Sequence, residues 1–403
     1  MPDSLPPNPR DLISQIANFS EFKTPTRIES RENIPYFLNE FWTSGQRRAH
    51  PLHEISYRGC FKPQLPRFFI DRATKQGDII HDPFMGRGTT PIEAALTGRI
   101  AYGNDINPLS KILARPRLAT PPAHEAIAKT LKEINWQKSD SAPQELLAFY
   151  HPDTLQALCA LREFLIQRAP IENPTPDPIL DWIRMIAVNR LTGHSPGFFS
   201  VRTMPPNQAV SVATQEKLNQ RHNTTPPPRD VAALILKKSK NLLRTHPPIF
   251  AHPPQLFTGS AAETPHIPNA SISLVVTSPP FLDVVQYADD NWLRAWFCGI
   301  DIAGLPIAMH RGLDTWQKMV REVLTEQARI LKPNGIVAFE VGEVRRGKIE
   351  LEKCVWQAAA GLPFDRLGVM VNVQKFSKTA QCWGVTNNSS GTNTNRIVLL
   401  QRN

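Results

Sequence analysis

One strand–loop–helix–strand pattern constrains the fold of this chain more than any other feature. The apolar pair Ile79 and Ile80 precedes the glycine loop DPFMGRGTT at 82–90, and after a helical stretch a second apolar segment runs from Ile100 to Gly103. Pro91 near the start of the helical stretch and Gly98 just past its end are residues typical of helix boundaries. Two strands joined through a helix lie parallel in one sheet. The pattern therefore predicts a βαβ unit within an α/β domain.

The glycine loop of this unit is suited to a ligand that carries a ribose. Gly86 and Gly88 let a ligand approach the backbone closely, and the amino end of the following helix favours an anionic group. Asp105 comes 23 positions after Asp82, near the spacing of about 20 at which a carboxylate binds ribose hydroxyls. Pro91 stands where the dinucleotide fingerprint has its third glycine. A nucleoside without a pyrophosphate, such as S-adenosylmethionine, therefore fits better than NAD.

The second informative stretch is TSPPF at 277–281, which follows the apolar run ISLVV. Pro279 and Pro280 cannot extend a strand's hydrogen-bond ladder, so the strand has to end there. Ser278 offers a hydroxyl, the backbone before the prolines offers fixed carbonyls, and Phe281 offers a ring for stacking. These groups can hold an exocyclic amine and its base, which must first flip out of a duplex. A tight turn or a proline-terminated strand would explain either motif alone, whereas the pair favours a functional site.

Together the two motifs resemble the S-adenosylmethionine-dependent amino methyltransferases of DNA. DPFMGRGTT is similar to their cofactor loop, and TSPPF is similar to their catalytic motif in the S-P-P form typical of cytosine-N4 enzymes, rather than the D-P-P-Y form of adenine-N6 enzymes. GNDINP, FLDVVQYADDNWLRAWF, LKPNGIVAFEVG and GTNTNRIVLL also resemble family segments. The resemblance covers about 55–120 and 255–401. It implies an α/β fold with a Rossmann-like methyltransferase sheet, helices on both faces and a terminal β-hairpin.

The resemblance also implies a role for individual residues. The catalytic residues around the target base would be Ser278, Pro279, Pro280 and Phe281. The residues that would bind S-adenosylmethionine are Lys62, Pro63, Leu65, Asp82, Phe84, Gly86, Gly88, Thr89, Asp105, Ile106 and Ser260. Among these, the FKPQLPR segment would close over the methionine end.

Three features depart from the family pattern. Arg87 stands where serine is usual, and Ser260 stands where an acid often contacts the adenine. The cofactor loop precedes the catalytic motif with an insertion between them, an order less common among cytosine-N4 enzymes. The first two departures concern cofactor contacts, and the third leaves the identity of the base open.

The chain is expected to divide into four parts. Residues 1–54 are polar with few periodic apolar positions and would form an N-terminal arm with short helical turns. Residues 55–120 would be the cofactor-binding part of the methyltransferase domain and 256–403 its catalytic part. Between them, helical segments alternate with proline clusters, so 121–255 would be an inserted, mainly helical target-recognition module.

The segment NRLTGHSPGFFSVRTMPPNQAVS at 189–211 is the candidate DNA contact within this module. Arg190, His194 and Arg202 would contact bases or phosphates, with Phe198 and Phe199 as wedges between bases. The alternative is a proline-bounded loop whose aromatic side chains pack onto the core.

Charge and cysteine content set the wider context. Lys and Arg number 46 against 36 Asp and Glu, an excess that favours a polyanionic partner. No apolar run approaches the roughly 18 residues of a membrane span, and the N-terminus has no signal-type apolar region. Five scattered cysteines without paired spacing predict a reduced, cytoplasmic protein with no metal site, in which Cys298 and Cys382 are packing residues.

The leading prediction is a site-specific methyltransferase that acts on cytosine N4 in double-stranded DNA, in a restriction-modification or epigenetic role. A cognate restriction endonuclease would be a further partner, whereas the recognition sequence and the oligomeric state cannot be read from the chain. Three alternatives stay open: an adenine-N6 DNA methyltransferase, an RNA amine methyltransferase, and a non-catalytic nucleic-acid-binding protein with a methyltransferase fold.

Overall fold

The computed structural model describes residues 9–403 except 23, 43–48, 58, 138–141, 172, 174–175, 205–208, 245–249, 283–286, 303, 308–309, 311, 345–348 and 374–394. Its elements in chain order are α1 (Pro9–Ala17), β1 (Arg27–Arg31), β2 (Ile34–Asn39), η1 (Pro51–His53), α2 (Gln64–Ala73), β3 (Ile79–Asp82), α3 (Thr89–Leu96), β4 (Ile100–Asp105), α4 (Pro108–Leu118), α5 (His124–Leu131), η2 (Gln144–Ala148), α6 (Pro152–Arg168), α7 (Pro178–Arg190), α8 (Val212–His222), α9 (Val231–Leu243), β5 (Gln255–Thr258), β6 (Ile272–Thr277), α10 (Tyr287–Cys298), α11 (Leu313–Ile330), β7 (Leu331–Val341), β8 (Glu343–Val344), β9 (Ile349–Glu350), α12 (Leu351–Ala358), β10 (Phe364–Asn372) and β11 (Asn395–Arg402).

A nine-stranded sheet organises these elements in the order β1-β2-β10-β11-β7-β6-β3-β4-β5. The five strands from β7 to β5 run parallel, and β11 lies antiparallel to both β7 and β10. From β3 the chain moves outward to β4 and β5, then returns to β6 on the other side of β3. This is the order reversal of a doubly wound, Rossmann-like sheet, and ligands bind such sheets at the carboxyl ends of the strands beside the reversal. The expected α/β fold and its terminal β10–β11 hairpin are confirmed.

Helices cover both faces of the sheet because its strands are apolar on both sides. Val275 of β6 packs with α11 and α12 on one face, whereas Leu274 and Val276 pack with α1, α2 and α3 on the other. Successive side chains of a strand point to opposite faces, so a strand buried on both sides reads as a continuous apolar run. The strand pairing confirms the predicted βαβ unit, because β3 and β4 are parallel and α3 connects them.

The N-terminal region differs from the expected arm with helical turns. Besides α1 it contains the β1–β2 hairpin, and β2 pairs in parallel with β10, which extends the central sheet. The hairpin turns at Glu32 and Asn33, both of which have positive φ values of 50° and 63°, as a two-residue turn between twisted strands requires. Tyr36 of β2 is fully buried. The region therefore forms a strand despite its polar composition, because β2 is buried against the distant strand β10.

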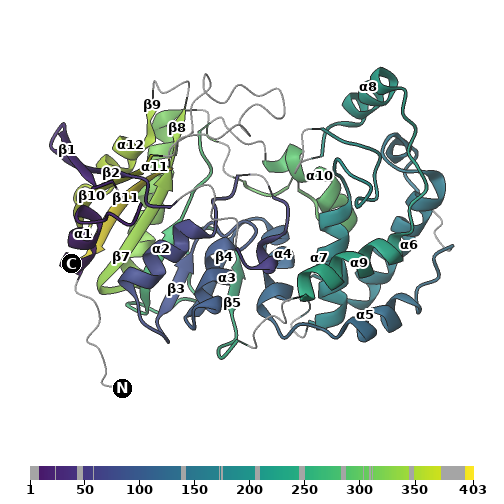
Figure 1. Cartoon of the computed structure of the whole chain (residues 1–403), viewed down its shortest axis with the longest axis horizontal. Helices are drawn as coiled ribbons and strands as arrows, with labels where there is room; N and C mark the ends of the chain where they lie inside the picture. The colour runs from purple at the N-terminus through teal and green to yellow at the C-terminus, as the bar shows by residue number, and fades with distance from the viewer. Residues whose placement is uncertain are drawn as a thin grey trace.

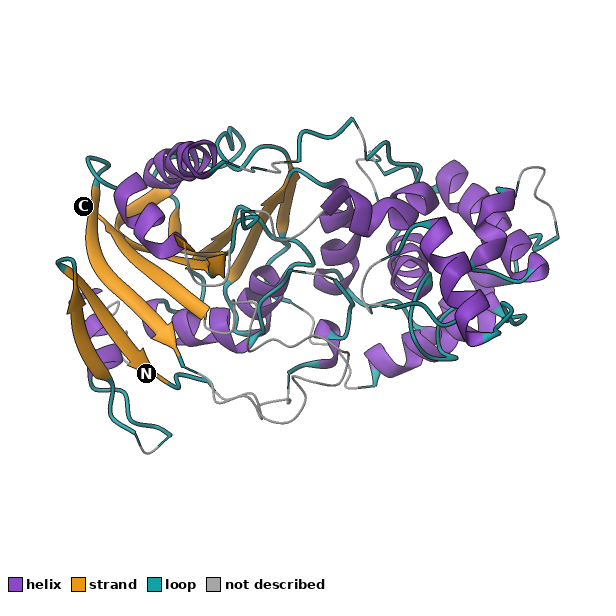
Figure 2. Cartoon of the chain, turned by 90° about the horizontal axis from the view of Figure 1, so that it is seen from above, coloured by secondary structure: helices purple, strands orange, loops and turns teal. Residues whose placement is uncertain are grey.

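The helices between 121 and 255 form a second body beside the sheet, grouped around α7 in the right half of Figure 1 and separated from the strands in Figure 2. Trp182, Ile183 and Ile186 of α7 are fully buried in its core. This core also includes Leu109 of α4 and Phe297 of α10. The module therefore packs continuously against the methyltransferase part, and its exact boundaries stay a prediction.

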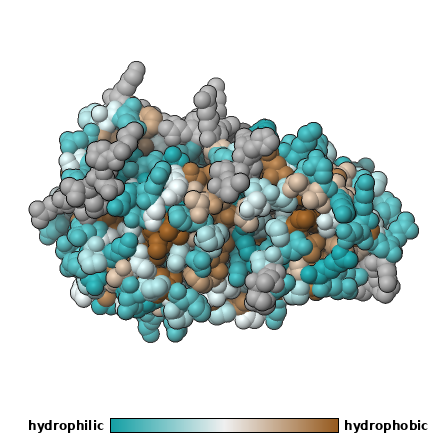
Figure 3. All heavy atoms as spheres, turned by 90° about the horizontal axis from the view of Figure 1, so that it is seen from below, coloured by the Kyte–Doolittle hydropathy of each residue, from teal (hydrophilic) through white to brown (hydrophobic). Residues whose placement is uncertain are grey.

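The face of the molecule shown in Figure 3 is largely polar. Hydrophilic residues dominate the face shown in Figure 3, and hydrophobic residues lie there in separate small patches. Among the described residues, the large hydrophobic side chains that stay exposed are Ile28 and Val373. In the described part of the chain, no helix combines the length and the apolar character that crossing a bilayer requires.

Candidate active site

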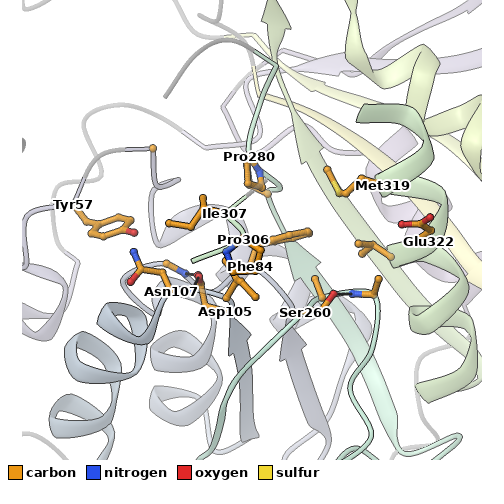
Figure 4. Close-up of a pocket in the computed structure, with 17 residues that line it drawn as sticks. Tyr57, Phe84, Asp105, Asn107, Ser260, Pro280, Pro306, Ile307, Met319 and Glu322 are labelled. Atoms are coloured by element: carbon orange, nitrogen blue, oxygen red, sulfur yellow. Dashed lines mark hydrogen bonds between the residues drawn. The ribbon is translucent and has the colours of Figure 1, made fainter. Parts of the chain in front are cut away.

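A cavity of about 150 Å³ opens at the carboxyl ends of β3, β4 and β6, where the sheet order reverses. Figure 4 shows Tyr57 and Asn107 on one side of it and Met319 and Glu322 of α11 on the opposite side. The cavity therefore brings together segments that are far apart in the sequence. The predicted residues that line it are Phe84, Gly86, Asp105, Ile106, Ser260, Ser278 and Pro280.

The glycine loop is held in shape by a buried carboxylate and by left-handed backbone. The Thr277 hydroxyl donates to Asp82 Oδ1 at 2.6 Å, and the Phe84 N–H donates to the same oxygen at 3.1 Å. Burial raises the pKa of Asp82 to about 7. Asp82 itself does not line the cavity, so its observed contacts fix the loop to the neighbouring strand β6.

Gly88 is the point where the loop passes into α3. Its φ is +81°, and a Cβ added there would stand 2.7 Å from the Cβ of Ala114. Thr89, the first residue of α3, is buried. Gly88 and Thr89 therefore support the loop on the side away from the cavity, and neither residue lines the cavity.

Asp105 joins the end of β4 to the glycine loop. Its Oδ2 accepts a hydrogen bond from the Gly86 N–H at 2.9 Å, and its Oδ1 accepts one from the Asn107 N–H at 2.9 Å. Burial raises the pKa of this carboxyl group. A carboxylate oxygen can accept a second hydrogen bond, so Asp105 can hold the loop and still offer acceptors to a ribose in the cavity.

The catalytic motif is fixed by its neighbours on both sides. The Trp316 Nε1–H of α11 donates to the Pro280 carbonyl at 2.8 Å. Ser278 and Pro280 face the cavity, whereas Pro279 does not line it, and the half-buried ring of Phe281 packs against the core beneath α11. In this structure the Phe281 ring packs against the core and does not line the cavity where it was expected to stack on a base.

An unpredicted acid lies beside the motif serine. Glu340 stands near the end of β7, the strand next to β6, and it forms a side-chain hydrogen bond with Ser278. The Asn395 amide of β11 donates to Glu340 Oε1 at 2.7 Å. Burial raises the pKa of Glu340 to about 7. A signal was present in the sequence, since an acid inside the apolar strand IVAFEVG is rarely buried without a partner.

The segment expected to close over the methionine end does not line the cavity, and residues that precede it in the chain do. Pro63 is the N-cap of α2, Leu65 is buried in the core under that helix, and Lys62 is exposed; none of the three lines the cavity. The cause is the amphipathic packing of α2, which turns Leu65 away from the site. Tyr57 and Gly59, which the sequence reasoning missed, line the cavity instead.

Among the insertion residues, Arg190 is the last residue of α7, and His194 and Arg202 lie in the segment between α7 and α8. Arg190 is half-buried, with its guanidinium 4.1 Å from the centroid of the Phe198 ring, and His194 and Arg202 are exposed. Phe199 is fully buried in the module core, so its predicted role as a wedge is wrong. Its burial follows from a backbone hydrogen bond of 2.9 Å to the Arg190 carbonyl, which draws the loop back onto α7.

The sequence predicted no metal site and a packing role for Cys298 and Cys382. Within the described ranges, no group of three or more His, Cys, Asp or Glu side chains could hold a metal ion. Cys298 is buried in the module core, and burial raises the pKa of its thiol to about 12. Cys382 lies outside the described residues.

Comparisons with known proteins match parts of the chain. A family model described as DNA methylase matches residues 15–114. The type II methyltransferase M.MjaII of Methanocaldococcus jannaschii is 40% identical over 72 residues, which are 18% of this chain and 13% of the relative. The type II methyltransferase M.MvaI of Kocuria varians is 27% identical over 132 residues, covering 32% of this chain and 27% of the relative.

A third relative methylates a different nucleic acid. The tRNA (guanine(10)-N2)-dimethyltransferase of Methanocaldococcus jannaschii is 31% identical over 112 residues, covering 24% of this chain and 31% of the relative. The chain thus spans less than a third of the length of each of these curated relatives. Each of these relatives is a methyltransferase by name, and the residues 15–114 matched by the family model include the glycine loop and Asp105.

Proposed function

We propose that the protein transfers a methyl group from S-adenosylmethionine to an exocyclic amine of a DNA base, and that the amine is N4 of cytosine. The observation that carries the proposal is the meeting of three groups at one cavity. Asp105 at the end of β4, the glycine loop and Ser278 at the end of β6 share its lining. An acceptor for the cofactor ribose and an acceptor for the target amine therefore line the same cavity.

The residues present fit the cofactor. Asp105 has acceptor capacity left for the ribose hydroxyls, and Gly86 leaves the loop open toward the cavity. Phe84, Ile106 and Tyr57 supply an apolar lining for the nucleoside. When bound, the cofactor supplies an electrophilic methyl group on a sulfonium.

The chain's own task is to hold and deprotonate the amine. The lone pair of cytosine N4 is delocalised into the ring, so the amine needs acceptors that polarise its N–H bonds. Ser278 Oγ accepts from the amine while its own proton points to Glu340. The proton lost from nitrogen then has an acceptor in the Glu340 carboxylate, and positioning supplies much of the remaining acceleration.

DNA binding is assigned to the helical module and to the net charge of +10. Arg190 ends α7, and His194 and Arg202 lie in the segment that follows it, where both are exposed. Double-stranded DNA is the proposed partner, in the cytoplasm, with a cognate endonuclease as a second partner if the protein serves restriction-modification.

Two other substrates, adenine N6 of DNA and an RNA amine, are each supported by one observation. The order of the motifs allows adenine N6, and the similarity to a tRNA dimethyltransferase allows an RNA amine. Mass spectrometry of nucleosides from cells that express the protein separates them. The proposal predicts N4-methylcytosine in DNA; N6-methyladenine, a modified base in RNA alone, or no modification would each overturn the cytosine assignment.

A further inference from the structure

Arg87 is the residue of the glycine loop that departs from the family's usual serine, and its side chain reaches from the loop to the segment before α2. Its Nη1 donates to the Ile55 carbonyl at 2.8 Å and to the His53 carbonyl at 3.1 Å, and its Nε donates to the Thr89 hydroxyl at 3.2 Å. Residues 51–57, which we call the Tyr57 segment, are thus hydrogen-bonded to the loop through backbone carbonyls. These bonds do not depend on the side chains of the segment.

A second arginine and a hydrogen bond between His53 and Glu93 fix the start of the same segment. The fully buried Arg117 of α4 donates to the Leu52 carbonyl at 2.8 Å and also to the Arg87 carbonyl. His53 Nε2 lies 2.7 Å from Glu93 Oε1 of α3. The first half of the Tyr57 segment is therefore anchored on α3 and α4, and Arg87 anchors the half that leads to Tyr57.

Tyr57 itself closes the cavity over the glycine loop. A Cβ added to Gly86 would stand 3.5 Å from the Tyr57 ring. Tyr57 lines the cavity on the side of Asn107, opposite α11 (Figure 4). The Arg294 guanidinium of α10 lies 5.8 Å from the centroid of the ring and donates to the Ser56 carbonyl at 3.1 Å.

We propose that Arg87 is a positioning residue for the cofactor site: it ties the Tyr57 segment to the glycine loop, so that Tyr57 forms the wall of the cavity that faces Gly86. A serine side chain is too short to span from the loop to these carbonyls and offers one donor where the guanidinium offers several. The identity of the ligand rests on the proposed function, whereas the tie between the two segments does not.

The test is a double-mutant cycle read as S-adenosylmethionine affinity by titration calorimetry on the full chain. Arg87→Ser and Tyr57→Ala should each weaken binding by roughly tenfold or more, and the double variant should bind no more weakly than Tyr57→Ala alone, because the two changes act on one wall. Arg87→Lys keeps one donor and should recover part of the loss. Additive losses, or wild-type affinity in Arg87→Ser, would overturn the proposal.

Arg99→Ser is the matched control. Arg99 also donates to backbone carbonyls, those of Thr97 at 2.7 Å and Thr74 at 2.8 Å, but at the opposite end of the βαβ unit. It should lower stability and leave cofactor affinity unchanged.

Amide hydrogen exchange of the unliganded protein separates this inference from the proposed function. Exchange at 53–57 should accelerate by about tenfold or more in Arg87→Ser and stay unchanged in Arg99→Ser. Equal protection of 53–57 in both variants would refute the tie itself. A wild-type protein that binds no S-adenosylmethionine would instead refute the proposed function and leave the exchange result standing.

Discussion

Replacement of Glu340 by glutamine should abolish a pH dependence that the wild-type protein shows near neutrality. The carboxyl group is buried, hydrogen-bonds to Ser278 and has its pKa raised by burial to about 7. If its charged form accepts the proton of the amine, wild-type turnover should fall to about half at pH 7 and about a tenth at pH 6, relative to its plateau at higher pH. Glu340→Gln keeps an acceptor for Asn395 but no proton acceptor.

The variant should therefore turn over slowly and with no inflection near pH 7. The assay measures kcat with saturating labelled cofactor and DNA from pH 5.5 to 9, with cofactor affinity measured in parallel. A loss of about 10- to 1000-fold in kcat with cofactor affinity unchanged would match the role of a group that acts in the transition state. A Glu340→Gln protein with wild-type kcat and the same inflection would show that Glu340 is not the proton acceptor.

The pH dependence of the free energy of unfolding tests the raised pKa of Glu340 independently of activity. The folded-state pKa of Glu340 lies above its ordinary value of 4.5, so the folded protein holds the proton more tightly than the unfolded chain. The associated stabilisation is complete below the unfolded pKa and is lost as pH rises through about 7, a change of about 3 kcal/mol in the free energy of unfolding. Asp82 titrates in the same range, so the term due to Glu340 is the difference between wild type and Glu340→Gln in urea titrations at several pH values. Equal pH dependence in the two proteins would contradict the assignment.

Three further predictions concern the cofactor loop and the module. Asp105→Ala should weaken cofactor binding by roughly 1.5 to 3 kcal/mol, the range for hydrogen bonds to a charged group, and unchanged affinity in a folded variant would remove its role. Gly88→Ala should destabilise the protein by about 1 to 3 kcal/mol in chemical unfolding, because φ is +81° and the added Cβ meets Ala114 at 2.7 Å; a wild-type midpoint would contradict this. DNA affinity should fall steeply with salt, and Arg202→Ala should reduce the slope of log K against log salt by about 0.9 if Arg202 contacts one phosphate, whereas an unchanged slope would exclude that contact.

The sequence predicted the parts of the site that depend on short-range spacing. Asp82, the loop glycines and Asp105 belong to one βαβ unit, so a spacing of 23 positions was enough to relate them. Ser278 was recognisable because two prolines end its strand. In each case the local pattern itself determines where the side chain lies at the sheet edge.

The rest of the site depends on pairing between distant segments. Glu340 meets Ser278 only because Thr277 of β6 is in register with Phe339 of β7, and a local pattern does not reveal that register. The strand that contains Tyr36 was missed for the same reason, since it pairs with β10 more than 300 positions away. Leu65 was assigned to the cofactor by resemblance, whereas the amphipathic packing of α2 buries its side chain in the core.

The most direct test of the proposed activity is transfer of label from S-adenosylmethionine to DNA by the purified protein, followed by digestion to nucleosides. We expect label in N4-methylcytosine, with turnover lowered by about 10- to 1000-fold in Ser278→Ala while cofactor binding stays nearly intact. Full activity in Ser278→Ala would contradict the assigned pocket. An absence of label from DNA, with a folded protein that binds the cofactor, would contradict the proposed function itself.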